Sequence, residues 1–268
     1  APKFSTKQKS AYRANTEMQL FCEEQGHFIT AFFKESRNLS EEFPELTQPD
    51  LARLLFVATY AAYPDNGESF SYLKHNNGIY INKKTLDQLL GMSRNPFNAF
   101  YNKLIDCGIL EEVEGKLAIN PRYFVRGDIK KVREFTSGLA HTRVFRGTIR
   151  NLYQIYNGRQ IKKLGLIYAV LPHINLKTNI VAHNPLETTT AYIEPMTLGT
   201  LADKLGYKDA NKLKQAMRAT RLEDQPVFQF VEDDTDARKK KVIVNPRVLF
   251  ASNTESLEAV IAMFNKAR

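Results

Sequence analysis

The feature that most constrains this chain is a weak internal repeat. Residues 117–124 (LAINPRYF) return as residues 242–249 (VIVNPRVL), and residues 85–91 (TLDQLLG) line up with residues 200–206 (TLADKLG). The offset grows along the chain, from 115 for the second pair of segments to 125 for the first. A duplicated domain shows this trend when its second copy carries longer loops. The sequence therefore predicts two related domains.

The repeat also sets the predicted domain boundaries. A further match aligns His27 and residues 37–39 with His141 and residues 150–152, which places the start of each copy upstream of those residues. In chain order we expect a basic N-terminal arm at 1–19, a first domain at 20–127, a basic connector at 128–140, a second domain at 141–252 and a C-terminal helix at 253–268.

The first copy reads as helices followed by a hairpin. Thr47 can cap a helix with a proline in its first turn, and Asn82 can cap a helix that Gly91 ends. Asn95 is expected to cap a further helix that starts at Pro96. Strands are expected at 28–33 and 79–81, and a hairpin at 109–120 that turns at 114–115.

The second copy follows the same order. We expect helices at 158–171, from Thr197 or Thr200 to Gly206, and from Asp209 to Thr220, and then a hairpin at 227–244. Helix, strand, helix, short turn, helix and hairpin is the order of a winged helix-turn-helix. The predicted fold is therefore α+β, mostly α, with tandem winged helix-turn-helix domains.

The second helix of a helix-turn-helix pair is the element that enters the major groove of DNA. Its exposed face must offer hydrogen-bond donors and acceptors to base edges, where Asn suits adenine and Arg suits guanine. The first copy offers Arg94, Asn95, Asn98 and Asn102, and the second offers Asn211, Lys212, Lys214, Gln215 and Arg218. For each of these residues, a polar surface that simply meets water is the alternative interpretation.

The charge distribution favours a polyanionic partner. The chain carries a net charge of +9, and residues 121–170 account for it, with eleven Lys and Arg against two acidic residues. Nucleic acid is the commonest partner of such a surface, although a solvated surface has the same composition. Phosphate contacts are predicted for Arg143, Arg146 and Arg150, and for Arg238, Lys239, Lys240 and Lys241 in the second hairpin.

The two hairpins differ in charge. The first carries Glu111, Glu112 and Glu114 and fits DNA contact poorly, whereas the second has a basic run beside an acidic tip. We therefore expect the second copy to make the stronger DNA contacts.

Three short motifs carry a resemblance to a known family. Gly108-Ile-Leu110, residues 118–124 (AINPRYF) and Arg126-Gly127-Asp128 follow the expected helix-turn-helix. This order resembles the RepL-type replication proteins of plasmids and related winged-helix proteins encoded by phages of Gram-positive bacteria. The resemblance covers residues 28–128 and implies a winged helix and a role in plasmid replication. The second copy departs from the pattern, with Ala251-Ser252 in place of Arg-Gly; the tandem layout is similar to that of two-winged-helix plasmid initiators.

Several other classes of protein are not expected. The five histidines are scattered, and no glycine-rich phosphate loop or nucleophile elbow is present, so we expect no enzyme, no metal and no cofactor. The longest uncharged apolar run, 54–63, is shorter than the roughly 20 residues that span a bilayer. Cys22 and Cys107 have no metal spacing, which favours a reducing compartment, here a bacterial cytoplasm or nucleoid.

The sequence thus predicts a sequence-specific double-stranded DNA-binding protein of a phage or plasmid, acting in transcription regulation or DNA replication. A winged-helix scaffold that docks replication or transcription machinery is the competing interpretation, and the acidic first hairpin supports it. Homodimerisation is a further expectation left open. RNA binding is disfavoured by the lack of exposed stacking motifs.

Overall fold

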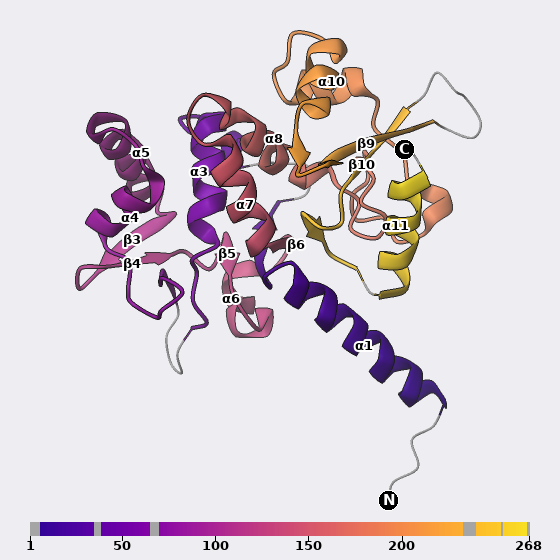
Figure 1. Ribbon diagram of the computed structural model, residues 1–268, viewed down its shortest axis with the longest axis horizontal. Helices are drawn as coiled ribbons and strands as arrows, with labels where there is room; N and C mark the ends of the chain where they lie inside the picture. The colour runs from indigo at the N-terminus through magenta and orange to yellow at the C-terminus, as the bar shows by residue number, and fades with distance from the viewer. Residues whose placement is uncertain (1–5, 35–38, 65–69, 233–239, 253, 267–268) are drawn as a thin grey trace, which may run out of the picture. The chain divides into compact units, whose positions relative to one another are not determined.

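The protein has an α+β fold with about 48% helix and 20% strand (Figure 1). The computed structural model describes residues 6–34, 39–64, 70–232, 240–252 and 254–266. Its contacts divide the chain into two compact units. The central unit comprises Ile29–Val144 and Ile149–Pro172, and the terminal unit comprises Ala1–Phe28, Phe145–Thr148 and His173–Arg268. This division differs from the predicted halves, because residues 149–172 group with the first copy.

The central unit alternates helices with short strands. Its elements are β1 (Phe28–Phe33), α2 (Leu39–Glu42), α3 (Gln48–Ala58), β2 (Ser71–Tyr72), α4 (Lys83–Leu90), α5 (Arg94–Asp106), β3 (Leu110–Val113), β4 (Lys116–Ile119), β5 (Phe124–Val125), η1 (Ile129–Val132), α6 (Arg133–Thr136), β6 (Ala140–Phe145), α7 (Arg146–Tyr156), η2 (Gly158–Gln160) and α8 (Lys162–Val170).

Local sequence signals explain where these helices begin and end. Thr47 and Asp50 form a capping box at the start of α3, and Asn82 and Thr85 form one at the start of α4. Gly91 ends α4 in the left-handed conformation, with φ of 61°. These caps confirm the predicted start of α3 and both predicted bounds of α4.

The hairpin and β2 form one antiparallel sheet in the order β2-β4-β3. Tyr72 on β2 and Glu111 on β3 both lie opposite Ala118 on β4. The hairpin turns at Glu114 and Gly115, whose φ values of 51° and 74° are both positive, as a two-residue loop requires. A second group of strands runs in the order β6-β1-β5.

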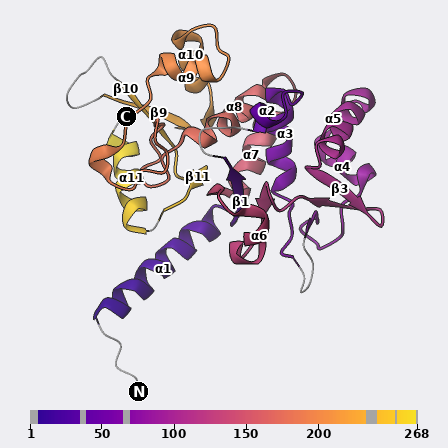
Figure 2. The same cartoon turned by 180° about the vertical axis from the view of Figure 1, so that it is seen from behind.

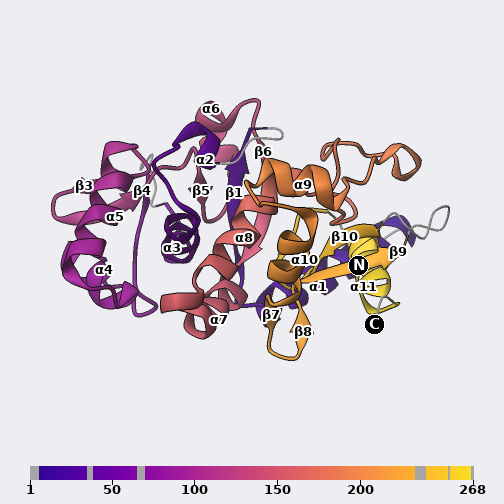
Figure 3. The same ribbon diagram turned by 90° about the horizontal axis from the view of Figure 1, so that it is seen from above.

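Two helices that are far apart in sequence pack together in the central unit. α3 lies against α8 (Figure 3), and the buried Phe56 ring stacks on Tyr153 of α7 with centroids 3.7 Å apart. The backbones approach so closely that a Cβ atom at Gly165 of α8 would overlap the carbonyl oxygen of Gln48. Glycine is therefore required where α8 meets the start of α3.

The terminal unit has a second helix pair and a second hairpin (Figure 2). Its elements are α1 (Thr6–Glu24), η4 (Thr190–Tyr192), α9 (Leu198–Lys204), α10 (Ala210–Arg218), β7 (Arg221–Leu222), β8 (Gln225–Pro226), β9 (Phe228–Glu232), β10 (Lys240–Val244), β11 (Leu249–Phe250) and α11 (Thr254–Lys266), with η3 (Leu171–His173) where the chain enters it. Thr197 caps α9, and Asp209 caps α10 by accepting a hydrogen bond from the Lys212 N–H at 2.8 Å.

Three backbone pairings in each unit follow a similar order along the chain. Ala61 pairs with Leu73, Lys74 with Tyr80 and Tyr72 with Ala118 in the central unit; Ile174 pairs with Val181, Ala182 with Pro195 and Ile180 with Ile243 in the terminal unit. The asparagine that follows each hairpin also makes the same type of hydrogen bond. Asn120 accepts a hydrogen bond from the N–H of Arg122 at 3.0 Å, and Asn245 accepts one from Arg247 at 2.9 Å.

Four sequence-based expectations need correction. The N-terminal arm is largely helix, because α1 starts at Thr6 and runs past the predicted boundary at residue 19. α5 begins at Arg94 after Ser93, so Asn95 lies inside the helix and does not cap it. The segment 79–81 contributes a single bridge at Tyr80. The helix expected at 158–171 is divided into η2, α8 and η3.

The close approach of α3 and α8 generates a stability prediction. Gly165→Ala should lower the free energy of unfolding by about 1–3 kcal/mol, because the added methyl group forces the two backbones apart. Gly199→Ala is the matched control, since its Cβ would have no heavy atom nearer than 3.8 Å, and it should be neutral or stabilising by up to about 1 kcal/mol. Thermal unfolding followed by circular dichroism measures both. Equal stability of the two variants would contradict this packing.

Candidate nucleic-acid interface

The strongest candidate surface is the outer face of α10. Leu213 and Met217 are fully buried, which fixes the orientation of the helix. The opposite face exposes Asn211, Lys212, Gln215 and Arg218 to solvent. Because residues at i, i+4 and i+7 share one side of a helix, Asn211, Gln215 and Arg218 form a continuous stripe. Four of the five predicted residues therefore lie together and are accessible.

The fifth residue, Lys214, turns towards the hairpin. It is half-buried, and its ammonium group lies 6.0 Å from the centroid of Phe230 on β9. The Arg218 guanidinium lies 5.7 Å from the same ring. Both cations therefore lie within the outer range of a cation–π contact with Phe230, where the helix face meets the hairpin.

The equivalent face of α5 is polar but carries fewer cations. Arg94, Asn95 and Asn102 are exposed, and Asn98 is half-buried. Lys103 on the next turn binds the Asp50 carboxylate at 2.9 Å. The structure therefore leaves Arg94 as the exposed cation among the four predicted residues of this face.

Two predicted phosphate contacts have other partners in the structure. Arg150 donates hydrogen bonds from Nε and Nη2 to Thr59 at 2.9 Å, and from Nη1 to Asn76 at 2.7 Å. Its guanidinium lies 3.9 Å from the centroid of Tyr60, and burial lowers the pKa of Arg150. Arg146 is 8% exposed. Both predictions of a phosphate contact need correction, because Thr59 and Asn76 hold the Arg150 guanidinium and the Arg146 side chain is buried.

The remaining predicted phosphate contacts are less defined. Arg143 is half-buried on β6 and Lys241 is half-buried on β10. Lys240 pairs through its backbone with Glu232. Arg238 and Lys239 lie outside the described residues. Phosphate contacts at these positions stay predictions.

The arginines of the two Asn-Pro-Arg steps have intramolecular partners. Arg122 pairs with Glu42 at 3.5 Å, and Arg247 pairs with Glu223 at 3.7 Å. The Nε atom of Arg247 also donates to Gln25 at 3.3 Å. Both arginines therefore anchor the chain where it leaves each hairpin.

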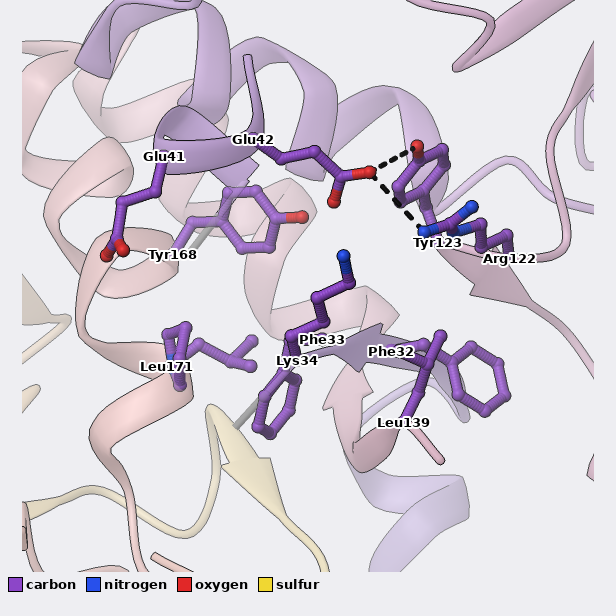
Figure 4. A pocket seen from close by; sticks show the side chains of 11 residues that line it. Phe32, Phe33, Lys34, Glu41, Glu42, Arg122, Tyr123, Leu139, Tyr168 and Leu171 are labelled. Atoms are coloured by element: carbon purple, nitrogen blue, oxygen red, sulfur yellow. Dashed lines mark hydrogen bonds and ion pairs between the residues drawn. The ribbon is translucent and has the colours of Figure 1, made fainter. Parts of the chain in front are cut away.

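A cavity of about 240 Å³ lies beside Arg122 in the central unit (Figure 4). The Glu42 carboxylate accepts a hydrogen bond from the Tyr123 hydroxyl at 3.4 Å, and burial raises the pKa of Tyr123 to about 12. Lys34 points towards Glu42 across the cavity. Since Lys34 and Arg122 balance Glu41 and Glu42 in charge, the lining selects neither an anion nor a cation.

A different group of side chains was missed by the sequence analysis, whose expectation that the chain has no exposed stacking motif was wrong. Phe70, Tyr72 and Tyr80 gather with Lys74 and Lys116 on the outer face of the β2-β4-β3 sheet. The alternation in residues 70–74 (FSYLK) is the signal that could have identified it, because alternate residues of a strand share one face.

No metal centre is evident in the part of the chain that the structure describes, where no three His, Cys, Asp or Glu gather suitably. His173 is the most unusual histidine. It is 1% exposed, and neither ring nitrogen has a hydrogen-bond partner among the described residues. Burial, and then the charges of Lys204 and His183, lower the pKa of His173 to about 4.

None of the helices within the described ranges combines the length and the apolar character needed to cross a membrane. Comparison of the chain with protein-family models, curated proteins and solved structures finds no match.

The contacts of Arg150 predict a structural role. Arg150→Gln should lower the free energy of unfolding by about 1–3 kcal/mol, because the buried oxygens of Thr59 lose their charged donor. Arg159→Gln removes the same charge from an exposed site and should change stability by less than about 0.5 kcal/mol. Chemical denaturation of both variants measures the difference, and an unchanged Arg150→Gln would contradict the role.

The buried His173 predicts a pH-dependent stability. Its folded-state pKa of about 4 lies below the ordinary value of 6.5, so the unfolded chain takes up the proton first and stability falls as the pH drops from about 6.5 towards 4. His173→Leu should remove up to about 3 kcal/mol of this loss, whereas the control His75→Leu should leave it in place. The free energy of unfolding, measured at pH 7.5, 6, 5 and 4, tests this prediction. Parallel plots of that free energy against pH for wild type and His173→Leu would contradict it.

Proposed function

We propose that this chain is a sequence-specific double-stranded DNA-binding protein composed of two winged helix-turn-helix domains. The observation that carries the proposal is the exposed outer face of α10, which presents Asn211, Lys212, Gln215 and Arg218 on the side opposite the core. This face supplies the donors and acceptors that base edges require, and its cations match the phosphates on either side of a groove.

The topology supports the winged-helix assignment. In the central unit, a helix (α3), a strand (β2), a helix pair (α4 and α5) and a hairpin (β3 and β4) follow one another. The strand before the helix pair joins the last strand of the hairpin, which gives the order β2-β4-β3. A winged helix has this element order, and the second helix of its pair is the one that enters the groove.

The repeated pairings support a duplication. Tyr72 opposite Ala118 corresponds to Ile180 opposite Ile243, and the Asn120 turn corresponds to the Asn245 turn. By this correspondence α4 and α5 match α9 and α10. Two reading helices on one chain can contact adjacent half-sites, as the two subunits of a dimer do.

The two copies would contribute unequally to DNA binding. α10 exposes two cations, Lys212 and Arg218, where the α5 face exposes Arg94. The hairpin after α5 carries the exposed Glu114, and Glu112 accepts a hydrogen bond from Tyr101 at 2.9 Å. We therefore assign most of the binding energy to the terminal unit.

The biological role follows from the resemblance to RepL-type replication proteins. We propose that the protein acts on phage or plasmid DNA in replication initiation or transcription regulation, in a bacterial cytoplasm or nucleoid. A second copy of the chain and the replication or transcription machinery are further partners within this proposal. The acidic hairpin at Glu111–Glu114 favours a protein contact, and docking of such machinery there is the second candidate function.

Binding selection and salt titration test the proposal. Duplexes enriched by the full chain from a random 30-base-pair pool should share one motif. Lys212→Ala/Arg218→Ala should weaken binding to the enriched duplex at least tenfold at 100 mM salt, because two cations leave the groove. The slope of log affinity against log salt concentration should fall by about 2, since each lost phosphate contact removes about one unit.

Arg159→Ala/Lys162→Ala is the control, because it removes two exposed positive charges from the central unit. It should keep the affinity within about threefold. Failure to enrich any motif, or equal losses for the two variants, would contradict sequence-specific reading by α10. The scaffold would be favoured if wild type did not bind DNA and if wild type and the Lys212→Ala/Arg218→Ala variant bound a replication protein equally well.

A further inference from the structure

A cluster of aromatic and basic side chains covers one face of the sheet in the central unit. Tyr72 and Tyr80 meet edge to face with centroids 5.4 Å apart, and Phe70 meets Tyr72 at 6.0 Å. The ammonium groups of Lys74 and Lys116 lie 4.4 and 4.5 Å from the Tyr80 centroid. We call these five residues the aromatic-basic face.

The register places the aromatic-basic face on the side of the sheet away from the helices. Ser71 and Leu73 are buried, whereas their neighbours Phe70, Tyr72 and Lys74 are partly exposed. Alternate residues of a strand point to opposite sides, so these three share the outer face. The chain therefore leaves three rings and two cations partly open to solvent.

The equivalent face in the terminal unit is different. Ile180 and Ile243 correspond to Tyr72 and Ala118, and they are buried in an apolar core with Phe21 of α1 and with Leu257 and Phe264 of α11. In that copy, helices therefore cover the outer face of the sheet. The aromatic-basic face occupies the corresponding position in the central unit. Its side chains suit a charged ligand and not the apolar side of a helix.

We infer that the aromatic-basic face binds single-stranded DNA, with bases stacking on Tyr72 and Tyr80 and phosphates binding Lys74 and Lys116. Aromatic rings interleaved with cations are the means by which proteins hold single strands without reading their sequence. Glu111 is the one carboxylate among the described strand residues of this face, as judged from its register opposite Ala118. The net charge of the face therefore favours a polyanion.

The lysine–tyrosine contacts are compatible with this role. A lysine over a partly exposed tyrosine is held weakly, and a stacked base contributes more than that contact. When a base takes the place of an ammonium group over Tyr80, Lys74 and Lys116 remain within one side-chain length of the strand and can bind its phosphates. This site is separate from α10 and does not require that helix to bind duplex DNA.

Fluorescence anisotropy of labelled oligo(dT) of 20 nucleotides with the full chain tests the inference. Tyr72→Ala/Tyr80→Ala should weaken oligo(dT) binding at least tenfold at 50 mM salt, whereas Tyr72→Phe/Tyr80→Phe should stay within twofold, because it keeps both rings. Lys212→Ala/Arg218→Ala should leave oligo(dT) binding within twofold and lower duplex binding alone. This last variant separates a failure of the inference from a failure of the proposed function.

A second measurement does not depend on variants that alter the fold. Ultraviolet crosslinking of the wild-type chain to an oligonucleotide containing 5-iododeoxyuridine should label the peptide that holds Phe70, Tyr72 or Tyr80. The inference is overturned if wild type does not bind oligo(dT), if the crosslinks map elsewhere, or if the folded alanine variant binds as well as wild type. Tighter binding of oligo(U) than of oligo(dT) would overturn single-stranded DNA as the ligand.

Discussion

The pairing of a short extended segment with the returning strand of a distant hairpin is the constraint on which the rest of each unit depends. Tyr72 lies opposite Ala118, and Ile180 lies opposite Ile243. Each pairing closes a loop that contains a helix pair, so the two helices are held against the sheet by backbone hydrogen bonds from both ends. The exposed face of α10 is fixed by this closure together with the burial of Leu213 and Met217.

The sheet of each unit has two sides, and only one of them packs against the helix pair. The inner side is largely apolar in both units, because it packs against the helix pair. The outer side is free to vary, and it bears isoleucines under α1 and α11 in one unit and tyrosines with lysines in the other. A cation held over an exposed ring contributes about 0.5–1 kcal/mol, less than the roughly 1–3 kcal/mol of a stacked base. In the proposed complex, a stacked base would offset the loss of one such contact.

Sequence alone identifies the features that depend on local chemistry. The caps at Asn82 and Thr197, the stop at Gly91 and the tight turn at 114–115 were all predictable, because each relies on the conformational preference of one or two residues. The outward direction of α10 followed from its 3.6-residue apolar period.

Features that depend on tertiary contacts were not predictable in this way. Arg150 looked like a phosphate ligand because nothing in its neighbourhood in sequence reveals Thr59 and Asn76 as partners. The aromatic-basic face brings together Tyr72, Tyr80 and Lys116, whose meeting requires the register of β2 and β4. Likewise, helical α1 has an ordinary polar composition, and its packing with α11 is a long-range contact.

Site-specific photocrosslinking from α10 tests most directly whether this helix reads duplex DNA. A benzophenone amino acid placed at the exposed Gln215 should crosslink to an enriched duplex, whereas the same group at the exposed Glu258 of α11 should not. The yield at residue 215 should fall as salt rises, because phosphate contacts hold the helix in place. Equal yields at the two positions, or none at residue 215 under conditions where the duplex is bound, would contradict the account.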